Sequence, residues 1–138
     1  MTERPLNILL VEDDEVDVMN VRRAFERNRL TNSLFVAGNG LEALAMLKEK
    51  QIPRDRRLVL LDLNMPKMNG IEFLEALRAD PELSDTPVVV LTTSNDDQDK
   101  HDAYNLNVAG YLLKPVTFNS FCDRMATLDR YWAQVEMP

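Results

Sequence analysis

The sequence predicts an α/β fold with a parallel sheet, because five short apolar segments alternate with five helical patterns along the chain. Three of the apolar segments, residues 8–11, 58–61 and 88–91, are continuous runs of aliphatic residues. Short runs without polar alternation are typical of central parallel strands that are covered on both faces. Two weaker runs, residues 34–37 and 111–113, are expected to form the remaining strands.

Helices are predicted between these strands, where apolar residues recur every three or four positions. The predicted helical segments are residues 16–25, 41–47, 71–77, 97–106 and 118–135. Asn39 and Thr117 precede two of these segments and can cap their first turns. Because no linker interrupts the alternation, residues 1–138 are expected to form one domain. Its core is expected to run from about 6 to 128, with the last helix reaching about 135.

Composition narrows the functional classes. The chain is 45% hydrophobic and 28% charged, with a formal net charge of -7, which is typical of a globular protein and argues against nucleic acid or an anionic membrane as partner. It has no run of about 20 apolar residues and no apolar core of a signal peptide near its start. One cysteine cannot form an internal disulfide, so we expect a cytoplasmic protein.

Acidic, hydroxyl or amino side chains, which can bind ions or take part in catalysis, follow four of the five apolar runs. Right-handed crossovers place the carboxyl ends of parallel strands at one edge of the sheet, where ligands of open α/β sheets bind. The residues that are expected to meet at this edge are Glu12, Asp13, Asp14, Asp62, Asn64, Thr92 and Lys114.

Several carboxylates in one place repel one another unless a positive group lies between them. Mg²⁺ is the cation that best suits a few carboxylates together with water and phosphate oxygens. Asp62 follows a central strand, and an aspartate can form a covalent phosphoryl intermediate. Lys114 and Thr92 could then neutralise and hydrogen-bond the phosphoryl oxygens. The edge therefore predicts magnesium-dependent phosphoryl chemistry on Asp62.

Four motifs give the sequence a clear resemblance to the receiver domains of two-component response regulators. They are Leu10-Val11-Glu12-Asp13-Asp14, Leu61-Asp62-Leu63-Asn64-Met65-Pro66 followed by Gly70, Leu91-Thr92, and Tyr111-Leu112-Leu113-Lys114-Pro115. The resemblance covers residues 6 to 128. It implies the flavodoxin-like fold of that family, a doubly wound five-stranded parallel sheet of strand order 2-1-3-4-5.

The resemblance also implies a role for each matching residue at the metal. Glu12 and Asp13 resemble the acidic pair that holds Mg²⁺, and Asp62 resembles the phosphoacceptor, which is also a metal ligand. Asn64 resembles the residue whose backbone carbonyl completes the metal shell.

A second set of matching residues resembles the family's switch. Thr92 corresponds to the switch hydroxyl, Lys114 to the conserved ammonium, and Tyr111 to the aromatic ring that swings inward after phosphorylation. The Lys114–Pro115 bond is expected to be cis, as in the family. Ser94 is expected to influence how fast the phosphoryl group is lost.

The implied function is that of a phosphoacceptor signalling protein, which assists its own phosphorylation and dephosphorylation without being an enzyme. A histidine kinase is the expected donor, and residues 51–57 and 92–95 resemble regulators that partner phytochrome-type kinases. Because the chain ends without an output domain, we expect the readout to be contact with a downstream protein. A homodimer is expected through the fourth helix, the fifth strand and the last helix, residues 97–106, 111–113 and 118–135.

Several residues allow a second interpretation. Asp14 lies beside the metal pair, but the favoured role is a cap of the first helix. His101 is expected on a solvated polar helix face, and Cys122 is expected to be a small core residue. Tyr131 and Trp132 either form an exposed apolar patch with Val135 or fold back on the core.

Two other functions use the same residues. An interaction module that has lost phosphorylation would not need Asp62, Thr92 and Lys114 together. A phosphohydrolase that works through an aspartyl phosphate usually carries an acid two residues after its nucleophile, where this chain has Asn64.

Overall fold

The structure, a computed structural model, describes residues 6–27, 32–65, 68–93, 95–114 and 118–134. Its elements are β1 (Asn7–Val11), α1 (Glu15–Arg27), β2 (Ser33–Ala37), α2 (Gly40–Lys48), β3 (Arg57–Leu61), α3 (Gly70–Ala79), β4 (Val88–Thr92), α4 (Asp97–Asn105), β5 (Gly110–Leu113) and α5 (Phe118–Gln134). The strands are parallel and lie in the order β2-β1-β3-β4-β5. The predicted fold class and strand order are confirmed. None of the described helices is long and apolar enough to cross a membrane.

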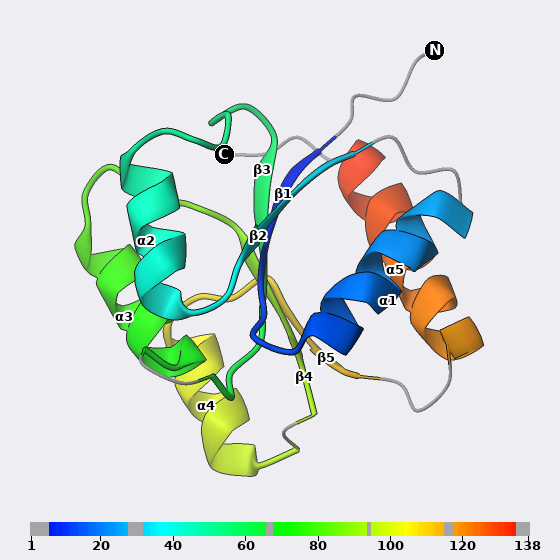
Figure 1. The fold of residues 1–138 in the computed structure, drawn as a ribbon. Helices are drawn as coiled ribbons and strands as arrows, with labels where there is room; N and C mark the ends of the chain where they lie inside the picture. The colour runs from blue at the N-terminus through cyan, green and yellow to red at the C-terminus, as the bar shows by residue number, and fades with distance from the viewer. Residues whose placement is uncertain (1–5, 28–31, 66–67, 94, 115–117, 135–138) are drawn as a thin grey trace.

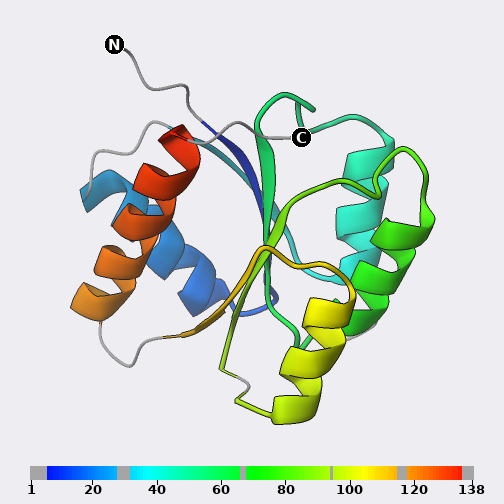
Figure 2. The same ribbon diagram turned by 180° about the vertical axis from the view of Figure 1, so that it is seen from behind.

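The continuous apolar runs form the three central strands because both of their faces are covered. Helices α2, α3 and α4 lie on one face of the sheet, and α1 and α5 lie on the other (Figures 1 and 2). In β1, Leu9 and Val11 belong to the core on the α2–α4 side, whereas Ile8 and Leu10 belong to the core beside α1 and α5. Successive side chains of a strand point to opposite faces, so a strand that has helices on both sides needs apolar residues at every position.

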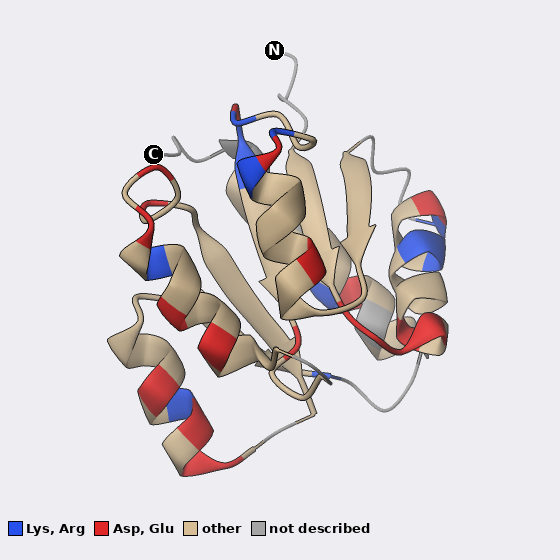
Figure 3. Ribbon diagram, turned by 60° about the vertical axis from the view of Figure 1, so that its left-hand side comes forward, with Lys and Arg blue, Asp and Glu red and all other residues tan. Residues whose placement is uncertain are grey.

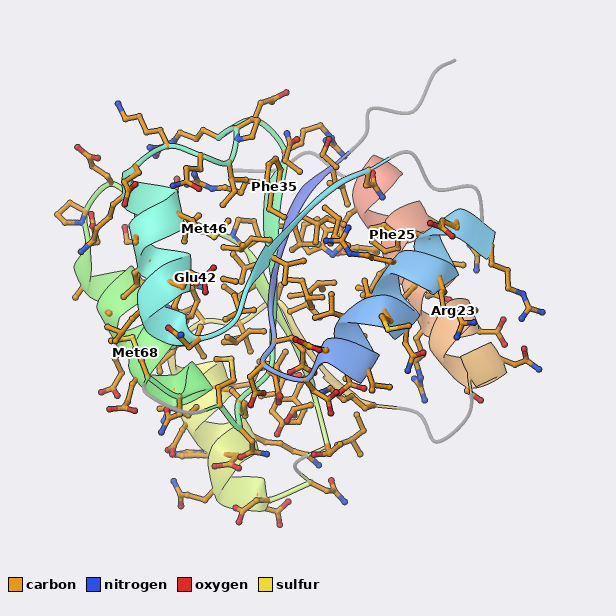
Figure 4. All side chains as sticks on the ribbon, viewed as in Figure 1. Arg23, Phe25, Phe35, Glu42, Met46 and Met68 are labelled. Carbon is orange, nitrogen blue, oxygen red and sulfur yellow. The ribbon has the colours of Figure 1, made fainter. Side chains whose placement is uncertain are left out.

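Side chains fill both layers between sheet and helices (Figure 4). Phe25 lies on the side of α1 that faces the sheet, and Met46 lies on the corresponding side of α2 (Figure 4). The edge strands β2 and β5 are only partly buried, which explains why their apolar runs are the weaker ones in the sequence.

Short polar side chains fix the starts of several helices. Asn39 accepts a hydrogen bond from the backbone N–H of Glu42 at 2.9 Å, as predicted for a cap of α2. Asn69 and Glu72 form a reciprocal capping box at α3. The Oδ1 atom of Asp14 accepts from the N–H of Val16 at 2.8 Å, which confirms that Asp14 caps α1. Thr117, the predicted cap of α5, lies outside the described residues.

The end of α5 decides between the two interpretations of its aromatic pair. The side chain of Trp132 is buried among the core residues beside α1 and α5, and the Arg56 guanidinium donates a hydrogen bond to its backbone carbonyl. Tyr131 is 60% exposed. The interpretation that Trp132 belongs to an exposed apolar patch is therefore wrong, because this side chain faces the layer between α5 and the sheet. Val135 lies outside the described residues.

Gly70 allows α3 to begin directly against the loop that follows β3. A Cβ atom at Gly70 would lie 2.6 Å from the Cα of Leu63 and 2.7 Å from the carbonyl oxygen of Asp62. The Gly70 N–H also donates to the carbonyl of Leu63 at 3.0 Å. Because Gly70 has no side chain, the start of α3 can lie directly against the backbone that carries Asp62.

Gly70→Ala is expected to destabilise the protein by about 1–3 kcal/mol, because the new methyl group meets backbone atoms that cannot rotate away. Chemical denaturation measures the change. Gly110→Ala is the matched control, since a Cβ there has only Val89 Cγ1 nearby, at 4.0 Å. Equal stability of the two variants would contradict the proposed close contact.

Candidate functional site

The carboxyl ends of four strands bring the predicted residues to one edge of the sheet. Backbone hydrogen bonds hold them there: the N–H of Glu12 donates to Ala37, that of Asp62 to Val11, and that of Lys114 to Thr92, at 2.8–3.0 Å. Acidic residues predominate around this end of the molecule (Figure 3).

Three carboxylates form the centre of this site. Glu12, Asp13 and Asp62 each offer an oxygen, and these oxygens all lie within 4.8 Å of one another. Glu12 and Asp62 are buried, whereas Asp13 is exposed. The Oε2 atom of Glu12 is buried and has no hydrogen-bond partner among the described residues. A buried acceptor without a partner is costly, so the donor set fits a hard divalent cation with oxygen ligands.

The protonation of Glu12 reflects the same crowding. Burial, together with the carboxylates of Asp62 and Asp17, raises the pKa of Glu12 to about 9. Lys114 opposes this shift but does not cancel it. Without a cation, the site therefore retains a proton at neutral pH, and a bound cation would take the place of that proton.

The two oxygens of Asp62 have different surroundings. Its Oδ1 atom accepts hydrogen bonds from the hydroxyl of Thr92 at 2.9 Å and from the backbone N–H of Asn64 at 3.2 Å. Its Oδ2 atom faces the Lys114 ammonium at 3.5 Å. The carboxylate is thus fixed through one oxygen while the other faces the cationic side of the pocket. The contact that Asn64 makes is through its N–H, and the metal-binding role of its carbonyl stays a prediction.

Asp17 belongs to the site although the sequence reasoning did not select it. Its Oδ2 atom lies 2.7 Å from the Nζ atom of Lys114, which also donates a hydrogen bond to Glu12. Burial alone would lower the pKa of Lys114, but its hydrogen bonds to Asp17 and Glu12 raise that pKa above its ordinary value. Asp17 lies in the first turn of α1, directly after the loop that carries Glu12 and Asp13, and this turn brings it to the pocket.

A sequence profile of the response regulator receiver domain matches residues 8–126 of the chain. The chain belongs to this family. Among curated relatives, the probable methanogenesis regulatory protein FilR2 of Methanothrix harundinacea is 38% identical over 135 residues, covering 94% of this chain and 85% of that protein. Response regulator Rcp1 of Synechocystis is 34% identical over 134 residues, covering 94% of this receiver and 90% of Rcp1.

Solved receiver structures agree closely with this fold. The phosphorylated cyanobacterial phytochrome response regulator RcpA is 30% identical, with a TM-score of 0.86 and coverage of 98% of this receiver and 99% of that chain. The Mn²⁺-bound form of Rcp1 is 34% identical, with a TM-score of 0.85 and coverage of 97% and 99%. These likenesses extend over the whole receiver.

The remaining predicted residues lie on β5, α4 and α5 or outside the described residues. Tyr111 is half-buried in β5, with the Lys100 ammonium 5.9 Å from its ring centroid and the Tyr104 ring 6.5 Å away. His101 is exposed and pairs with Asn105 on α4, as expected for a polar helix face. Cys122 is buried in the core, as predicted. Ser94 and Pro115, and hence the predicted cis bond, lie outside the described residues.

The raised pKa of Glu12 predicts that the metal-free receiver loses stability as pH rises from about 5 to about 9. A proton on Glu12 is favoured by the folded state from its ordinary pKa of 4.5 up to about 9, so this stabilisation is complete below pH 4.5 and is lost as pH approaches 9. Thermal denaturation in the presence of a chelator measures it. Mg²⁺ should raise stability more at the upper end of this range.

Glu12→Gln is the control, because its amide has no proton to lose. The lowered pKa of Asp17 acts on the acid side of 3.8, and the raised pKa of Lys114 acts above 10.5, so neither group accounts for a slope between these limits. An identical slope in the wild type and in Glu12→Gln would contradict the assignment.

Proposed function

We propose that Asp62 of this receiver accepts a phosphoryl group from a histidine kinase. The observation that carries the proposal is the geometry of its carboxylate: Thr92 and Asn64 hold Oδ1, while Oδ2 faces Lys114 at 3.5 Å beside two further acids. A nucleophile held in one orientation, with a cation beside its reacting oxygen, is what phosphoryl transfer requires of a protein.

In the proposed step, a carboxylate oxygen of Asp62 attacks the phosphorus of a phosphohistidine. The O–P bond forms and the P–N bond breaks, and the histidine nitrogen leaves with the bonding electron pair. The Lys114 ammonium and the Thr92 hydroxyl are placed to interact with oxygens of the transferred group. No other reactant is required.

Glu12, Asp13, Asp62 and the backbone carbonyl of Asn64 are the residues that we propose hold Mg²⁺. The ion would neutralise phosphoryl oxygens and the surrounding carboxylates. The carboxylate spacing and the orphaned oxygen of Glu12 support this assignment. The Mn²⁺-bound form of the relative Rcp1 supports a divalent cation in this family.

Signalling would follow from movement of Thr92 toward the phosphoryl group. Its hydroxyl already bonds to Asp62, so a group on Asp62 must draw or displace it. Tyr111 lies on the next strand, with Val90 of β4 as its register partner. We propose that its ring turns inward and changes the face of α4, β5 and α5, and that this face binds a downstream protein or a second copy of the chain.

The exposed apolar side chains on this face support a role in association. Tyr104 on α4, Leu113 on β5 and Tyr131 on α5 are 53%, 38% and 60% exposed. Large exposed apolar side chains that gather on one face are typical of interaction surfaces. We therefore propose a homodimer through this face.

The kinase partner is proposed to be of the phytochrome type, in the cytoplasm. Support comes from the likeness to RcpA, a phytochrome response regulator, over 98% of the chain. Turnover as a phosphohydrolase is disfavoured, because the exposed Asn64 stands where such an enzyme usually has an acid. The receiver is thus proposed to act as a phosphoacceptor and not as an enzyme.

Asp62→Asn is expected to abolish phosphorylation, because an amide oxygen cannot act as the nucleophile. The measurement is intact mass after incubation with Mg²⁺ and acetyl phosphate, and then with a phosphorylated kinase. Asp13→Asn is the comparison variant, since it keeps the nucleophile and should only raise the Mg²⁺ requirement. Phosphorylation of Asp62→Asn would refute the acceptor assignment.

We expect phosphorylation of Asp62 to increase the fraction of dimer. Thr92→Ala should still accept the phosphoryl group but should not show this increase, because the hydroxyl that responds to the group is gone. Analytical ultracentrifugation measures the dimer fraction with and without Mg²⁺ and beryllofluoride, which mimics the phosphoryl group. Tyr131→Ser tests the proposed face directly, because it should lower the dimer fraction. A mimic-dependent increase in Thr92→Ala equal to that of the wild type would contradict the switch role.

A further inference from the structure

Asp17 forms a contact with Lys114 that the proposed function does not explain. The Lys114 ammonium lies 2.7 Å from Asp17 Oδ2 and 3.5 Å from Asp62 Oδ2, so it is closer to the helix than to the phosphoacceptor. Both side chains are mostly shielded, with 10% exposure for Lys114 and 27% for Asp17. An ion pair that is partly buried persists better than one on the surface.

We propose that Asp17 is a positioning residue that restrains Lys114 on the α1 side of the pocket and thereby slows phosphorylation of Asp62. The inference rests on the proposed function, because it concerns the ammonium that serves the phosphoryl group. It adds a residue that sets the rate.

The hydrogen-bonding capacity of Lys114 carries the first part of the argument. An ammonium has three N–H donors. One contacts Glu12 and one contacts Asp17, whereas Asp62 Oδ2 lies farther away, at 3.5 Å. Two of the three donors are thus held by acids, and a phosphoryl oxygen on Asp62 can draw the ammonium closer only by weakening these contacts.

Asp17 does not have the position of a metal ligand. The oxygens that lie within 4.8 Å of one another come from Glu12, Asp13 and Asp62, and Asp17 is not in this group. When Glu12 turns to a cation, its hold on Lys114 weakens, but that of Asp17 does not. Asp17 is then the acid that keeps the ammonium on the α1 side.

The backbone of Asp17 is fixed while Lys114 has a long, flexible stem. The cap residue Asp14 accepts from the N–H groups of Val16 and Asp17, at 2.8 and 3.4 Å. Helix α1 is in turn packed against the sheet and α5 through Val21, Ala24 and Phe25. Any approach of the ammonium to the phosphoryl group must therefore lengthen its contact with Asp17.

Calorimetry first measures the Mg²⁺ affinity of each variant, so that Mg²⁺ can be kept saturating. The experiment then compares the rates at which acetyl phosphate phosphorylates the variants. Asp17→Asn is expected to be labelled about two- to fivefold faster, the range of a partly exposed ion pair. Asp17→Glu should restore the wild-type rate. Asp17→Ser is a second variant, in case the asparagine variant does not fold.

Removing Asp17 also removes a negative charge that repels an anionic donor, so two controls separate this effect. Glu15→Gln removes the same charge from the same helical turn at an exposed position, and its rate should stay near that of the wild type. Lys114→Met should be labelled more slowly, and adding Asp17→Asn to it should bring no further change. If Lys114→Met is not labelled at all, beryllofluoride affinity is compared in the same proteins.

The outcomes are distinct. A wild type that is never labelled overturns the proposed function itself. A labelled wild type with an unchanged or slower Asp17→Asn overturns only the restraint. Equal acceleration by Glu15→Gln, or acceleration by Asp17→Asn in the Lys114→Met background, assigns the effect to charge alone and also overturns the restraint.

Discussion

Carboxylates that are crowded into a buried pocket repel one another, and the way in which this repulsion is balanced governs the rest of the molecule. Glu12 and Asp62 are buried with Asp13 beside them, and the only described cation in contact with them is Lys114. Burial and the neighbouring carboxylates raise the pKa of Glu12, and one ammonium does not cancel this shift. The pocket therefore favours whatever brings positive charge, which makes proton, divalent cation and ammonium competitors for the same oxygens.

The fold fixes this crowding through the backbone. Register pairs Val11 with Leu61 and Thr92 with Leu113, so the residues that follow these strands emerge side by side. Gly70 then lets α3 pack against the loop that carries Asp62, with no room for a methyl group. The buried sheet supplies the stability that an isolated acidic cluster could not have. A receiver thus keeps an unfavourable arrangement of charge because its strands leave the carboxylates no alternative.

The parts of the structure that could be predicted from the sequence are those that depend on local pattern. Continuous apolar runs identified the central strands, and the polar residues after them located Glu12, Asp62, Thr92 and Lys114 at one edge. Trp132 was undecided because the last helix is longer than the fold needs, so the sequence does not say whether its end still packs against the body of the domain. Asp17 was missed because its partner Lys114 is 97 residues away, and an acidic first turn is common in helices for reasons of the helix dipole alone.

The same two residues show why the balance of charge is adjustable. An acid at position 17 lies outside the group of possible metal ligands, so changing it need not remove the cation. It touches Lys114, however, and so alters how much of the ammonium's charge reaches Asp62. Residues of this kind can set the rate of a reaction while the catalytic residues stay unchanged, because they act on the position of a charge and not on its presence. In a fold with a fixed strand order, the first turn of α1 is well suited to this role, since its backbone is held by Asp14 while the side chain of Asp17 reaches Lys114.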